Sequence, residues 1–69
     1  MKTYTVKHVE SGTERVEMSY RDAKDALLDL IQEFGDPVEI WRNDRNGNPV
    51  EKIRTSTGLW TTYHYLPAN

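Results

Sequence analysis

Polar and apolar residues alternate along the first part of the chain. In residues 3–9, β-branched and aromatic side chains take turns with polar ones, and Val16 and Met18 repeat this two-residue spacing within residues 14–18. A period of two is typical of a strand with one buried face. A Glu-Ser-Gly-Thr cluster at residues 10–13 separates the two segments and favours a turn. The pattern therefore predicts a β-hairpin.

Apolar residues then recur at steps of three and four, which is the spacing of one helix face. The sequence predicts a helix over Tyr20–Phe34. Ser19 is suited to the N-cap, and the carboxylate of Asp22 is favourable in the first turn. Gly35 is suited to end the helix, and Pro37 prevents its continuation. The apolar face consists of Ala23, Leu27, Leu30, Ile31 and Phe34, and it is widened by Ala26 and Leu28.

Three further strands are predicted after the helix, at residues 38–43, 50–55 and 59–66. Residues 44–49 contain an Asn-Gly pair typical of a tight turn, and the Ser-Thr-Gly at 56–58 favours another. Short turns make neighbouring strands antiparallel. The expected fold is α+β, with a single antiparallel sheet, the order β-β-α-β-β-β, and one amphipathic helix packed on one face. At 69 residues, the chain is expected to form one domain, residues 1–69.

One helix covers only one face of a sheet, so alternate strand residues are expected to divide between the helix and solvent. The residues expected to face the helix are Val6, Val16, Met18, Val38, Ile40 and Ile53. The residues expected on the open face are Thr5, Lys7, Trp41, Lys52 and Arg54. The predicted core joins Leu27, Leu30, Ile31 and Phe34 of the helix to Val6, Ile40 and Ile53.

The last predicted strand carries aromatic side chains on both of its faces. Trp60 and Leu66 share one face and form the more apolar pair, which favours an inward orientation for them. Tyr63 and Tyr65 would then point outward beside Trp41. The pattern does not fix the register of this strand, so both assignments stay open.

Composition indicates the cellular compartment in which the chain is expected. The chain has no cysteine, so neither a disulfide nor a cysteine-based zinc site is expected. Its first four residues, Met-Lys-Thr-Tyr, do not resemble the start of a signal peptide. Its longest unbroken apolar stretch, residues 26–28, is far too short to cross a membrane. We therefore expect a cytoplasmic protein without a membrane partner.

Charge is segregated along the chain. Residues 10–39 contain nine acidic and three basic residues, a net charge of −6, whereas the segments on either side carry +2 each. Part of this excess forms an acidic row on the outward side of the predicted helix, at Asp22, Asp25, Asp29 and Glu33. Such a row is the ordinary appearance of a solvated helix face. The alternative is a protein-binding surface that docks on a basic partner and speeds association.

Residues suited to catalysis are scarce. The chain has two histidines, His8 and His64, and no cysteine. His8 and Glu10 share a strand face at two-residue spacing and would supply half of a metal site, but two ligands do not make one. We therefore expect no catalytic residues, no metal and no cofactor, and we expect a protein that is not an enzyme.

The open face of the sheet offers a second binding surface. Tryptophan, tyrosine and arginine are over-represented among interface hot spots, which favours protein binding here. A second copy of the chain is one such partner. Two alternatives stay open, because cross-strand aromatic pairs also stabilise a sheet, and a basic aromatic face can stack single-stranded nucleic acid. The acidic net charge of −2 argues against nucleic acid. The candidate residues are Trp41, Lys52, Arg54, Tyr63 and Tyr65.

The run Ile-Arg-Thr-Ser-Thr-Gly-Leu-Trp at residues 53–60, beside an aromatic strand and after one acidic helix, is similar to segments of small phage-encoded anti-CRISPR proteins. The resemblance covers the last two strands and the general architecture, and it transfers no individual binding residue. It implies a non-catalytic inhibitor that binds a host defence nucleoprotein complex in the host cytoplasm. The expected function is thus a small protein-binding module, with single-stranded nucleic-acid binding as the alternative.

Overall fold

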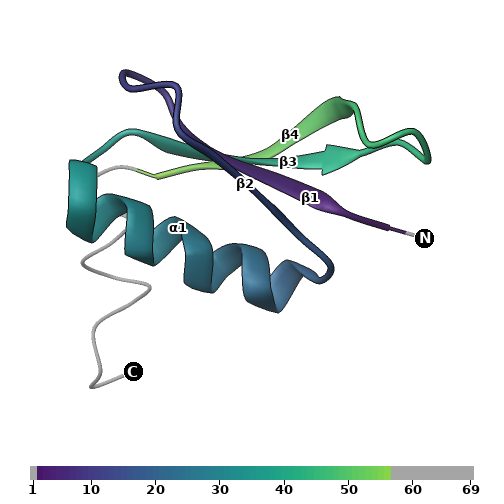
Figure 1. Cartoon of the computed structure of the whole chain (residues 1–69), viewed down its shortest axis with the longest axis horizontal. Coiled ribbons are helices and arrows are strands. Elements are labelled where there is room, and N and C mark those ends of the chain that lie inside the picture. Colours follow the sequence, from purple (N-terminus) through teal and green to yellow (C-terminus); the bar gives the residue numbers. More distant parts are fainter. Residues whose placement is uncertain (1, 57–69) are drawn as a thin grey trace.

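The computed structural model describes residues 2–56. Its elements are β1 (Tyr4–His8), β2 (Glu14–Glu17), α1 (Tyr20–Phe34), β3 (Val38–Asn43) and β4 (Pro49–Thr55). The strands form one sheet in the order β2-β1-β3-β4, and every neighbouring pair is antiparallel. The helix α1 lies along one face of this sheet (Figure 1). The α+β class with an antiparallel sheet and one helix is therefore confirmed. The described residues hold four strands rather than five, and the strand predicted at 59–66 lies outside them.

The helix begins and ends where the sequence predicts. The hydroxyl oxygen of Ser19 accepts a hydrogen bond from the backbone N–H of Asp22 at 3.0 Å, as an N-cap does. Gly35 has a φ of 89°, which favours glycine, and its N–H donates to the carbonyl of Ile31 at 2.7 Å. The predicted bounds, Tyr20–Phe34, are confirmed.

The core lies between α1 and the three strands it packs against, β1, β2 and β3. Leu27 and Leu30 of the predicted core are fully buried, whereas Ile31 is only partly buried. Phe34 is 41% exposed, although its ring stacks on that of His8 with centroids 5.0 Å apart. The buried apolar residues are Val6, Ala23, Ala26, Leu27, Leu30, Val38 and Ile40.

The orientation predicted for β2 is wrong. Val16 pairs with Thr5 and is 60% exposed on the side of the sheet away from α1. Arg15 pairs with Val6 instead, and its guanidinium lies 3.3 Å from the carboxylate of Asp29 on the helix. A register shift of one residue exchanges the two faces of a strand. Arginine is tolerated on the helix side at the edge of the core, because its aliphatic stem can cover apolar surface while its guanidinium stays in solvent. Met18, which follows β2, is likewise 61% exposed rather than buried.

The orientation predicted for β4 is right at Lys52 but wrong at Ile53 and Arg54. Ile40 pairs with Arg54 and Trp41 with Lys52, so Ile53 has no register partner on β3 and lies at an irregularity of the β3–β4 pairing. Arg54 therefore shares the face of Ile40, and its guanidinium lies 6.0 Å from the ring centroid of Tyr20 on the helix. Ile53 is 38% exposed, because the helix packs against β1, β2 and β3 and leaves β4 at the border of the sheet.

Among the residues described, no helix is long and apolar enough to cross a membrane.

Candidate binding face of the sheet

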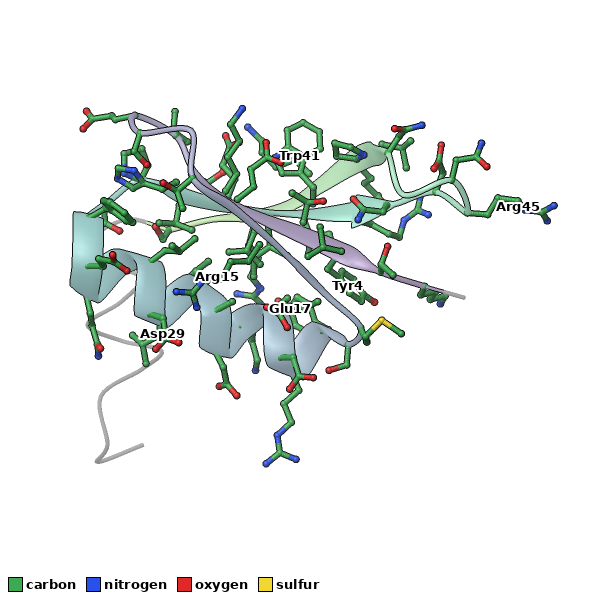
Figure 2. All side chains as sticks on the ribbon, in the orientation of Figure 1. Tyr4, Arg15, Glu17, Asp29, Trp41 and Arg45 are labelled. Carbon is green, nitrogen blue, oxygen red and sulfur yellow. The ribbon has the colours of Figure 1, made fainter. Side chains whose placement is uncertain are left out.

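The side of the sheet opposite α1 is termed the open face, and its residues follow from the strand register. One row runs across all four strands through Val16, Thr5, Trp41 and Lys52. The next row runs through Glu14, Lys7, Glu39 and Thr55. Trp41 projects from this face, away from the helix (Figure 2). Trp41, Lys7 and Lys52 thus lie on the predicted side, whereas Arg54 lies on the other.

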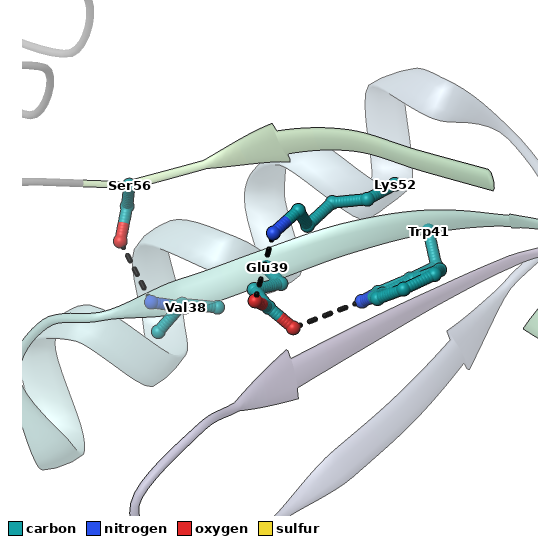
Figure 3. Close-up of polar contacts among 5 residues, drawn as sticks. All are labelled: Val38, Glu39, Trp41, Lys52 and Ser56. Carbon is teal, nitrogen blue, oxygen red and sulfur yellow. Dashed lines mark hydrogen bonds and ion pairs between the residues drawn. The ribbon is translucent and has the colours of Figure 1, made fainter.

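Trp41 is held in place by a carboxylate from its own strand. The indole N–H of Trp41 donates to Glu39 at 3.0 Å, and the ammonium of Lys52 lies 3.6 Å from the other carboxylate oxygen (Figure 3). The side chain of Glu39 is only 19% exposed, compared with 49% for that of Lys52. Glu39 therefore links the aromatic residue to a cation of the open face.

The residues beside Trp41 on the open face are polar and hydrogen-bonded to one another. Thr5 and Asn43 are buried, and the hydroxyl of Thr5 donates to the side-chain oxygen of Asn43 at 2.8 Å. The side-chain amide of Asn43 donates in turn to the hydroxyl of Thr3 at 3.0 Å. Trp41 itself is half-buried, although it lies on the face away from the helix. The indole is held against the sheet, which lowers the entropy that binding would cost.

Within residues 2–56, the formal charges of the open face balance. Lys7 is the cross-strand neighbour of Glu14 on β2 and of Glu39 on β3. Lys52 forms an ion pair with Glu39. Two lysines thus face two glutamates. The sequence-based site omitted both glutamates, although Glu39 lies two residues before Trp41 in the same strand and must share its face. Tyr63 and Tyr65, the other aromatic residues predicted here, lie outside the described residues.

The acidic row predicted on the helix is exposed. All four of its side chains are exposed on α1: Asp22, Asp25, Asp29 and Glu33. Asp29 is partly neutralised by Arg15 of β2 at 3.3 Å, and Asp22 lies in the first helical turn, where the helix dipole favours a carboxylate. Asp25 and Glu33 are the members whose charge is least compensated in the described part of the chain.

His8 is more constrained than the sequence indicates. Its ring is buried, and its Nδ1 accepts a hydrogen bond from the backbone N–H of Ser11 at 3.1 Å. The hydroxyl of Ser11 lies 2.7 Å from the same nitrogen, and it donates a hydrogen bond to the hydroxyl of Thr13 at 2.9 Å. His8 thus organises the β1–β2 turn. Within residues 2–56 there is no group of three or more histidine or acidic side chains placed to hold a metal.

Comparison of this chain with protein-family models, with curated proteins and with solved structures finds no match.

Proposed function

We propose that this chain is a non-catalytic protein-binding module that contacts its partner through the open face. The observation that carries the proposal is Trp41, an aromatic side chain preorganised by Glu39 at the centre of the sheet. Val16, 60% exposed in the same cross-strand row, extends the apolar contact area. Central aromatic residues surrounded by smaller contacts are typical of interface hot spots.

The charge balance of the open face favours a protein partner over nucleic acid. A platform for single strands combines aromatic stacking with a groove of uncompensated positive charge. Here Lys52 is paired with Glu39, Lys7 lies between two glutamates, and Arg54 is on the opposite face. A mixed, neutral surface with one tryptophan instead suits the polar and apolar groups of a folded protein.

The proposed partner is a host nucleoprotein complex, as the resemblance to anti-CRISPR proteins implies. The acidic row on α1 supports this choice, because proteins that hold nucleic acid present basic surfaces. The helix α1, which carries the row, lies on the side of the sheet opposite the open face (Figure 1). In this proposal the acidic row attracts the complex from a distance, and the open face makes the contact that holds it.

Replacing Trp41 with alanine is expected to weaken the complex by about 2 kcal/mol or more, as truncation of a hot-spot aromatic does. The measurement is capture from a bacterial lysate on the immobilised chain, followed by titration of the captured protein. One half of the lysate is treated with nuclease, because a protein partner survives that treatment. The matched control is Arg45→Ala in the exposed β3–β4 turn, which should bind as the parent does. Equal capture by the Trp41→Ala and parent chains would contradict the proposal.

Reversing Asp25 and Glu33 to lysine is expected to change the free energy of unfolding by about 0.5 kcal/mol or less, because both side chains are exposed. The double variant should associate more slowly with the captured basic partner, and its association rate should depend less on salt. Stopped-flow association at several salt concentrations measures both quantities. An association rate and salt dependence equal to those of the parent would reduce the row to a solvated helix face.

A further inference from the structure

We infer that Glu39 is the specificity-determining residue of the open face, because it keeps a surface with lysines and a tryptophan from binding nucleic acid. This inference rests on the proposed function, in which the open face takes a protein partner. It assigns to one carboxylate the choice between the two ligand classes that such a face can accept.

Glu39 lies among the side chains with which the open face would hold a single strand. One carboxylate oxygen accepts the indole N–H of Trp41 at 3.0 Å, and the other lies 3.6 Å from the ammonium of Lys52. Lys7 is the residue opposite Glu39 on β1. The carboxylate is therefore bordered by both lysines of the open face and by the aromatic ring on which a base would stack.

The position of Glu39 makes its charge effective. Its side chain is only 19% exposed, so water screens its charge less than that of a carboxylate at the rim. It neutralises Lys52, which is half-exposed and would otherwise be available to a phosphate. A base stacked on Trp41 would also bring its phosphate close to this negative charge, and like charges repel. A neutral protein surface meets neither obstacle.

Glu14 is a natural comparison for Glu39. It also lies on the open face and also borders Lys7, but it is on the edge strand β2 and is exposed. It lies in the same cross-strand row as Glu39 but is separated from Glu39 and Trp41 by β1. If only the net charge of the face mattered, removing either carboxylate would have the same effect. The structure instead gives the determining position to Glu39.

The test is the variant Glu39→Gln, titrated with a short oligothymidylate at low salt. Glutamine keeps a side-chain oxygen that can accept the indole N–H of Trp41, so the ring stays in place while the charge is removed. The chain has two tryptophans, so all proteins in the test also carry Trp60→Phe, and the fluorescence then reports Trp41 alone. We expect only weak quenching for the Trp60→Phe chain at low salt, and this chain sets the reference affinity. For the Glu39→Gln variant, we expect quenching with an affinity higher by on the order of tenfold, which is lost as salt is raised.

Two further variants define the mechanism. Adding Lys52→Gln to Glu39→Gln should abolish the gain, because the lysine that the carboxylate had neutralised is then absent. Glu14→Gln should produce a much smaller gain than Glu39→Gln. Thermal unfolding of each variant establishes that it is folded at the temperature of the titration.

The inference is overturned if Glu39→Gln gains no oligonucleotide affinity, if Glu14→Gln gains as much, or if the chain that retains Glu39 binds equally well. Each of these results leaves the effect of Trp41→Ala on protein capture untouched. Conversely, a protein complex insensitive to Trp41→Ala removes the proposed function without deciding how Glu39 acts on oligonucleotides. The two failures are therefore distinguishable.

Discussion

Leu30→Ala is expected to lower the free energy of unfolding by about 2–5 kcal/mol, the range measured for leucine truncation in a packed core. Leu30 is fully buried in the cluster that joins α1 to the sheet. A domain of 69 residues has a small core, and its total stability is expected near the lower end of the usual range of about 5–15 kcal/mol. The substitution should therefore remove a large part of the stability, which urea unfolding followed by circular dichroism would measure.

Leu28→Ala is the matched control for this prediction. It makes the same chemical change on the same helix, but Leu28 is only partly buried, so its loss should be clearly smaller. Leu30→Val, a milder truncation, provides an intermediate value if the alanine variant is unfolded at room temperature. Equal losses for Leu28→Ala and Leu30→Ala would mean that the helix packs on the sheet with a different face.

Ser56→Ala is expected to cost about 1–3 kcal/mol, the penalty for leaving a buried backbone group without a partner. Ser56 is fully buried beside the start of β3, and its hydroxyl oxygen accepts the backbone N–H of Val38 at 2.8 Å (Figure 3). The same hydroxyl donates to the carboxylate of Asp36 at 2.7 Å, and the N–H of Ser56 donates to the carbonyl of Val38 at 2.8 Å. The side chain thus closes the end of the β3–β4 pair. Urea unfolding measures the loss.

Two variants separate the bonds that Ser56 makes. Asp36→Asn keeps an oxygen that can accept the Ser56 hydroxyl, so most of the stability should remain. Thr55→Ala, at the exposed neighbouring position, controls for the loss of a hydroxyl group at the end of β4 and should cost less. If Ser56→Ala unfolds at the same urea concentration as the parent, the N–H of Val38 does not depend on this serine.

The strongest local patterns sufficed to predict the framework of the fold. The helix follows from its own residues, since its N-cap at Ser19, its apolar spacing and its glycine stop at Gly35 all act within a few positions. The paired segments 38–43 and 50–55 follow equally from their β-formers and from the turn between them. Burial of Leu27, Leu30 and Ile40 was predictable, because a single apolar stripe leaves only one way to pack a helix on a sheet.

The candidate site was only partly predictable. Trp41 was placed on the open face because the adjacent Ile40 anchors β3 to the core. Its partner Glu39 was missed, because a strand pattern shows which residues share a face and not which of them form a hydrogen bond. The charge balance of the open face was missed for the same reason, since it arises from residues on four different strands.

The sequence by itself determined where the helix, the turns and most strands lie, because those choices depend on contacts between near neighbours. Only the tertiary structure decided which way the two edge strands face. In the four residues of β2, Arg15 and Val16 can exchange faces by a slip of one position, and pairing with β1 selects the face. In β4, the irregularity at Ile53 shifts the alternation, so Arg54 moves to the helix side. The alternation of residues within a strand does not show where such an irregularity lies. Which residues of an edge strand are buried depends on how far one helix reaches across the sheet.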